Sequence, residues 1–150
     1  MGRIFEGMSD FFARDDWKTT QLEGKLTLRM GFSGDDSSWT CFAQAREQQE
    51  QVCFYSVAPV KVPEDRRTEM AQFLHRANYG MIIGNFEMDY SDGEVRYKTS
   101  VDVEGSELTF ALMKQVVYPN VLTMDRYLKA IMAVSFGGID AVAGVAMVEG

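Results

Sequence analysis

Hydrophobic and polar residues alternate along the chain with two different periods, and these periods predict the order of its elements. An apolar stripe at helical spacing predicts a first helix that ends near residue 16. Every second residue is then apolar over 26–32, which indicates a half-buried strand. Two further strands are expected around 39–46 and 52–57, and the polar segment 47–50 suits a hairpin between them. The residues of the first stripe are Ile4, Phe5, Met8, Phe11 and Phe12.

Two prolines mark the passage from these strands to a second helix. Pro59 and Pro63 are expected to end the third strand, because proline has no N–H for the ladder. Pro63 also suits the first position of a helix, so the second helix is expected over 63–78. Asn78 is a plausible left-handed residue at the end of that helix.

A second group of strands and two further helices follow. Alternating residues predict strands around 85–90 and 95–103, joined by an Asp-Gly turn. A helical pattern with an interruption near Pro119 then fills 107–136, and an alanine-rich helix is expected over 140–148. The predicted order is α-β-β-β-α-β-β-α. Because the hairpins are local, this order predicts an α+β fold of two layers, an antiparallel sheet with helices on one face.

Length and composition are those of one ordinary globular domain over residues 1–150. The chain is 46% hydrophobic and 25% charged, which excludes disordered and disulfide-scaffold proteins. It carries 15 Lys and Arg against 22 Asp and Glu, a net charge of −7. This balance excludes a nucleic-acid binder that relies on a basic surface.

The absence of targeting signals predicts a cytoplasmic protein with no membrane partner. No stretch resembles a signal peptide or the roughly 20 apolar residues of a membrane span. Because cytosolic thiols are kept reduced, Cys41 and Cys53 are interpreted as free, buried hydrophobic residues without a role in function.

Motifs for catalysis, metal binding and phosphate binding are missing. The lone histidine, His75, has no recognisable nucleophile or carboxylate partner in the sequence. Neither paired Cys-x-x-Cys motifs nor glycine-rich phosphate loops occur, and the acidic clusters at 35–36 and 89–94 coincide with predicted turns. We therefore expect no cofactor, no metal and no catalytic residue.

Two apolar regions are candidates for interaction. Residues 1–105 carry 30 charges and 106–150 carry seven, so the C-terminal region is either buried against the sheet or forms a homodimer interface. The first strand offers an apolar row that could receive a protein partner. Alternatively, these four side chains are buried in the hydrophobic core of the protein itself, and the sequence leaves both interpretations open. The row consists of Leu26, Leu28, Met30 and Phe32.

Four segments together resemble the YbjN family, in particular its cyanobacterial and plastid-type members. The segments are Val62–Arg67, Phe73–Tyr79, Gly84–Asp89 and Asp92–Lys98, and the resemblance covers about residues 25–136. That family is similar in fold to type III secretion chaperones, which are small acidic homodimers that bind segments of other proteins. Members are often labelled sensory transduction regulators. The resemblance implies no cofactor and no catalytic residue.

The leading hypothesis is thus a non-enzymatic protein-binding module with a chaperone-like or regulatory role. A small-molecule-sensing regulatory domain and an enzyme without a recognisable motif are the alternatives. An open apolar groove with a polar rim favours protein binding, whereas an enclosed pocket with converging polar groups favours the alternatives.

Overall fold

The computed structural model describes residues 2–150 and contains, within them, six strands in one antiparallel sheet of order β1-β2-β3-β4-β6-β5. The elements in chain order are α1 (Arg3–Arg14), β1 (Thr20–Gln21), β2 (Thr27–Ser33), β3 (Ser38–Arg46), β4 (Gln51–Lys61), the 3₁₀ turn η1 (Glu64–Arg66), α2 (Arg67–Asn78), β5 (Asn85–Asp89), β6 (Glu94–Asp102), α3 (Phe110–Phe136) and α4 (Ala141–Glu149).

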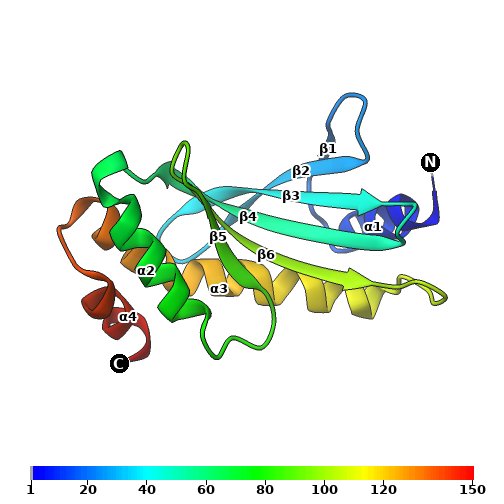
Figure 1. Ribbon diagram of the computed structural model, residues 1–150. Coiled ribbons are helices and arrows are strands. Elements are labelled where there is room, and N and C mark those ends of the chain that lie inside the picture. Colours follow the sequence, from blue (N-terminus) through cyan, green and yellow to red (C-terminus); the bar gives the residue numbers. More distant parts are fainter. Residues whose placement is uncertain (1) are drawn as a thin grey trace.

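The helices form a second layer on one face of the sheet (Figure 1). Helix α3 runs beneath β4 and β6, α1 packs on β3, and α2 packs on β5, while α4 rests on α2 and α3. The opposite face carries no helix, and the β1–β2 hairpin rises above it. The predicted two-layer α+β architecture is confirmed.

Strict alternation in the central strands explains why one face is buried. In β3 the residues Trp39, Cys41, Ala43 and Ala45 are buried, and their neighbours are exposed or half-buried. Strand β4 shows the same period, so the two strands turn one continuous apolar surface toward the helices.

The interruptions predicted at Pro59 and Pro119 are wrong, and the structure gives the reason for each, whereas the third strand does end before Pro63. Strand β4 continues through Pro59 because its register against β6 is broken between Val57 and Lys61, where no ladder hydrogen bond is required. Helix α3 continues through Pro119 because residues on both sides of it, such as Val117 and Val121, are buried against the rest of the core.

Strand β1 was not expected. Its two residues show no apolar alternation, and they pair with Arg29 and Leu28 at the edge of β2. The predicted five-stranded sheet therefore gains a sixth, very short strand.

The second helix begins and ends differently from the prediction. Pro63 precedes the 3₁₀ turn η1, and the α-helix itself starts at Arg67. Asn78 is still helical, and its side-chain amide pairs with the β5 backbone instead of capping the helix. Its Oδ1 accepts from the Phe86 N–H at 2.7 Å, and its Nδ2 donates to the Phe86 carbonyl at 3.1 Å. This pairing covers part of the outer edge of the sheet at β5.

Arg66 is held by the helical layer. Its guanidinium donates to the carbonyls of Val134 at 2.9 Å and Ile139 at 2.6 Å, at the C-terminal end of α3 and just beyond it. Carbonyls at a helix C-terminus carry partial negative charge, so this is a favourable place for an arginine. Arg66 thus ties η1 to the connection between α3 and α4.

Candidate functional site

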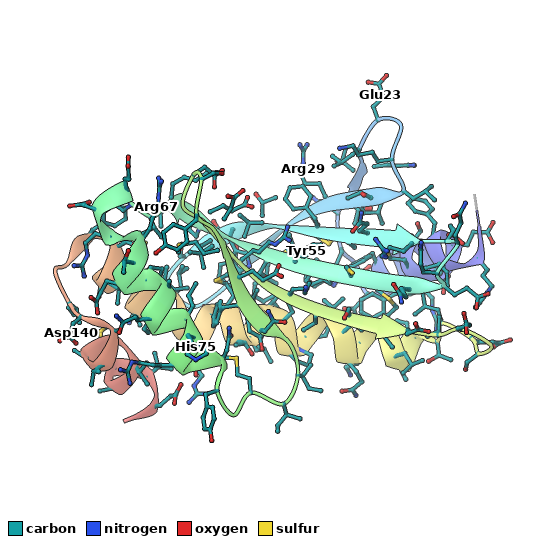
Figure 2. The ribbon with its side chains drawn as sticks, viewed as in Figure 1. Glu23, Arg29, Tyr55, Arg67, His75 and Asp140 are labelled. Atoms are coloured by element: carbon teal, nitrogen blue, oxygen red, sulfur yellow. The ribbon has the colours of Figure 1, made fainter. Side chains whose placement is uncertain are left out.

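The helix-free face of the sheet carries an aromatic pair between two cations. Phe42 of β3 lies opposite Tyr55 of β4, and both are half-buried although no helix covers them. In the same register row, Arg29 of β2 flanks Phe42 and Lys98 of β6 flanks Tyr55. Figure 2 shows Arg29 on the side of the sheet away from α3, which is also the side of the β1–β2 hairpin with Glu23 at its tip.

A compact ionic cluster borders the aromatic pair on the β5 side. The Glu87 carboxylate accepts from Arg96 Nε at 2.8 Å and from Lys98 Nζ at 2.9 Å. The Arg96 guanidinium also lies 4.2 Å from the centre of the Tyr55 ring, a cation–π contact. This cluster fixes the side chains that surround Tyr55.

Two hollows on this face share residues and form one groove. The larger, of about 890 Å³, extends from Arg29 and Phe42 over Val57 to Pro59. The smaller, of about 400 Å³, lies beneath the β1–β2 hairpin and reaches Tyr55. We call this surface the open-face groove and define it by Lys25, Arg29, Thr40, Phe42, Tyr55, Val57, Lys61, Glu94 and Arg96.

The charge of the open-face groove is opposite to that of the protein. Its lining contains one carboxylate, Glu94, against four cations, whereas acidic residues outnumber basic ones in the whole chain. The four cations are Lys25, Arg29, Lys61 and Arg96.

We expect the ionic cluster to make stability sensitive to acid. Burial opposes ionisation of Glu87, but hydrogen bonds from Lys98 and Arg96 prevail and hold the pKa of its carboxyl below the ordinary value of 4.5. A lowered folded-state pKa stabilises the protein above the unfolded-state value, and that contribution is lost as the pH falls through the folded pKa. Urea unfolding between pH 7 and pH 3 should show a smaller acid-induced loss for Glu87→Gln than for the parent, by less than about 1 kcal/mol because the pair is partly solvated. Equal losses in both proteins would contradict the assignment.

The apolar row proposed from the sequence for partner binding turns toward the protein's own core. Leu28 and Met30 are each 4% exposed, and Leu26 and Phe32 are half-buried against the same core. Phe32 lies between the rings of Trp17 and Trp39, with centroids 5.8 and 5.4 Å away. Leu26, Leu28 and Met30 therefore lie on the face opposite the open-face groove, whereas Phe32, near the end of β2, packs on the core and also borders the larger hollow.

The aromatic pair was missed, although a signal for it exists in the sequence. Phe42 in β3 and Tyr55 and Val57 in β4 occupy the phase that is otherwise mostly polar, so apolar side chains stand on both faces at the centre of the sheet. Apolar residues in both phases of a strand indicate that both faces contact something. Helices supply the contact on one side only.

The groups examined for catalysis have structural roles or no partner. His75 is exposed on α2 (Figure 2), and in the described residues its ring makes no hydrogen bond. In the β5–β6 turn, Asp89 binds Ser91, and Asp92 binds Lys61 and the Glu94 N–H.

Across residues 2–150 no three metal-ligating side chains come together. Although α3 has 27 residues, neither it nor another helix in that range is apolar enough over sufficient length to cross a membrane.

The two cysteines are free and differ in environment. Cys41 is buried beside Ser56 Oγ at 3.5 Å, and burial raises the pKa of its thiol to about 11. Cys53 is half-buried on the helix-free face, so its interpretation as a buried residue is corrected.

Since only a thiolate reacts readily, a disulfide reagent should modify Cys53 in the folded protein and Cys41 only after unfolding. Fast modification of both thiols in native buffer would contradict this.

Comparisons with known proteins confirm the resemblance. The family model YbjN, described as a putative bacterial sensory transduction regulator, matches residues 6–132. The crystal structure of YbjN from E. coli, titled a putative transcription regulator, superposes with a TM-score of 0.64 at 10% identity, covering 85% of this chain and 90% of that one. A chain of the HopA1–SchA chaperone–effector complex gives 0.52 at 16% identity, with coverages of 83% and 92%. No curated protein sequence matches. At these identities the structures show a shared fold, which is the predicted secretion-chaperone-like fold.

Proposed function

The chain belongs to the YbjN family, and from this premise we propose that it is a non-enzymatic protein-binding module with a chaperone-like or regulatory role. Its binding surface is the open-face groove, which receives a segment of another polypeptide. The observation that carries this proposal is the half-buried pair Phe42 and Tyr55 on a face that no helix covers, rimmed by charged side chains. An open apolar floor with a polar rim is the usual form of a protein interaction surface.

The shape of the groove supports a polypeptide ligand over a small molecule. Its floor is one side of a sheet, the two hollows join along β3 and β4, and only the β1–β2 hairpin overhangs the smaller hollow. Small-molecule sites bury most of their ligand in a concave pocket with converging polar groups. Covering the exposed parts of Phe42, Tyr55 and Val57 would contribute on the order of 2–4 kcal/mol before the costs of association.

The edges of the sheet are partly occupied. At β5 the Asn78 side chain already occupies backbone groups of Phe86. At the other edge, β1 pairs with Leu28 and Arg29, so the free backbone of β2 is limited to the segment from Met30 to Ser33. This segment borders the groove, and a bound chain that leaves the groove there can extend along it.

Site-specific photo-crosslinking in the cells that make the protein tests the proposal. A benzophenone amino acid is placed at Thr40, which is exposed in the groove, and as a matched control at Gln115, which is exposed on α3. We expect discrete adducts from position 40 that are absent from position 115. Identical adducts from both positions, or none from position 40, would argue against the groove as the binding surface.

We also propose that the protein is a homodimer through its helical layer. The C-terminal helices leave Phe136, Val142 and Met147 between 51% and 59% exposed, so they present apolar side chains that a second copy could cover. Light scattering at roughly 50 µM should give the mass of a dimer, and the pair Val142→Asp and Met147→Asp should give that of a monomer with an unchanged melt. A parent protein that is monomeric at this concentration would refute the dimer.

A further inference from the structure

We infer that the segment bound in the open-face groove is acidic, with carboxylates on either side of aliphatic or aromatic residues. The inference rests on the proposed function and specifies its ligand. It follows from which cations in the groove are already neutralised and which are not.

The hairpin side of the groove holds two cations without partners. In residues 2–150, neither the Arg29 guanidinium nor the Lys25 ammonium makes an ion pair or a side-chain hydrogen bond. Both side chains line the groove and are exposed. A guanidinium binds a carboxylate through two parallel hydrogen bonds, so Arg29 is suited to anchor an acidic side chain.

The β6 side of the groove also retains positive charge. Arg96, which lines the groove, and Lys98, which lies at its border, share the single carboxylate of Glu87, so these three side chains carry one net positive charge; Glu94 is the one carboxylate in the groove lining. The aromatic pair lies between this cluster and Arg29 in the same register row. Arg29, the aromatic pair and Lys98 therefore follow one another across the strands, with Lys98 at the border of the groove.

The register sets the spacing expected in the ligand. Arg29 and Lys98 are separated by three steps between neighbouring strands, which is about 14 Å at roughly 4.8 Å per step. An extended chain covers that distance in about four residues. A segment that crosses the strands should thus carry carboxylates about four positions apart, with apolar side chains between them over Phe42 and Tyr55.

A single-stranded nucleic acid is the competing polyanion, because aromatic rings beside cations also bind bases. Two observations favour the polypeptide. The Arg96 guanidinium already occupies one face of the Tyr55 ring at 4.2 Å, where a base would stack. The protein's net charge of −7 opposes a ligand with a phosphate at every nucleotide, but it is compatible with a segment of few carboxylates.

Selection from a random library of 12-residue displayed peptides tests the inference. We expect the recovered peptides to be enriched in Asp and Glu on both sides of apolar residues. The affinity of a recovered peptide should fall about tenfold or more in Arg29→Glu. It should change less than about twofold in Lys114→Glu, which alters the net charge equally but lies on α3. All variants are first checked for an unchanged cooperative melt.

The outcomes separate this inference from the proposed function. Neutral or basic peptides whose binding is lost in Phe42→Ser would overturn the acidic ligand and leave the groove as the binding surface. If Phe42→Ser melts abnormally, Thr40→Trp replaces it, since bulk at this exposed position obstructs the groove. No recovered peptide, or binding that is indifferent to these variants, would overturn both proposals. A labelled 12-nucleotide RNA that binds more tightly than the peptides would also overturn the inference.

Discussion

Replacing Leu28 with Asp is expected to abolish cooperative melting of the protein. Leu28 is 4% exposed and belongs to the core beneath the sheet. The substitution removes a buried side chain, which typically costs about 2–5 kcal/mol, and adds an unpaired charge in an apolar site. A domain of this kind has a total free energy of unfolding of about 5–15 kcal/mol. Thermal melting followed by circular dichroism measures the effect.

The neighbouring residue supplies the matched control. Arg29 adjoins Leu28 in β2 but points to the helix-free face, so Arg29→Asp should melt cooperatively, within about 1 kcal/mol of the parent. If Leu28→Asp also melted normally and lost only partner binding, the apolar row of β2 would be a binding surface after all. That result would refute its assignment to the core.

Replacing Asn120 with Asp should have the second-largest effect, a fall in the free energy of unfolding of about 3 kcal/mol or more. Asn120 is fully buried in α3, and its Nδ2 lies 3.0 Å from the carbonyl oxygens of Phe54 and Tyr97 and 3.2 Å from Thr99 Oγ1. This amide joins the helix to β4 and β6. A carboxylate has no hydrogen to donate at neutral pH and would repel these oxygen atoms. Urea unfolding at pH 7 gives the difference.

The control for Asn120→Asp is the reverse exchange on the same helix, Asp125→Asn. Asp125 Oδ1 accepts from the Asp35 N–H at 3.1 Å, and an asparagine keeps that acceptor. Asp125→Asn should therefore change stability by less than about 1 kcal/mol. If the two exchanges had equal effects, the amide of Asn120 would not hold the helix to the sheet as described.

Much of the fold could be predicted from the sequence because each element has a clear period. The stripe from Ile4 to Phe12 and the alternation of β2 and β6 are dictated by one buried face apiece. The errors lie where a contact with another element decides the local structure. Pro119 stays helical because its neighbours are buried, and Asn78 stays helical because its amide binds Phe86. Neither partner is visible from local sequence.

The candidate site was harder to predict because sequence alternation does not say which face the helices cover. The row from Leu26 to Phe32 and the pair Phe42 and Tyr55 are both apolar, and they lie on opposite faces of the sheet. Only the packing of α1 and α3 distinguishes them, since it buries the first and leaves the second open. The cationic character of the groove was hidden by the acidic composition of the whole chain. Lys25, Arg29 and Arg96 come together only through strand pairing and the β1–β2 hairpin.

The most direct test of polypeptide binding in the open-face groove is a backbone-amide chemical-shift map of the ¹⁵N-labelled protein with the tightest selected peptide. The groove predicts that the perturbed amides cluster at 29–31, 40–44, 53–57 and 94–98, on four adjacent strands. It also predicts that α3 and α4 remain largely unperturbed. Perturbations concentrated on those helices, or on the loop between α2 and β5, would contradict the assignment of the helix-free face as the binding surface.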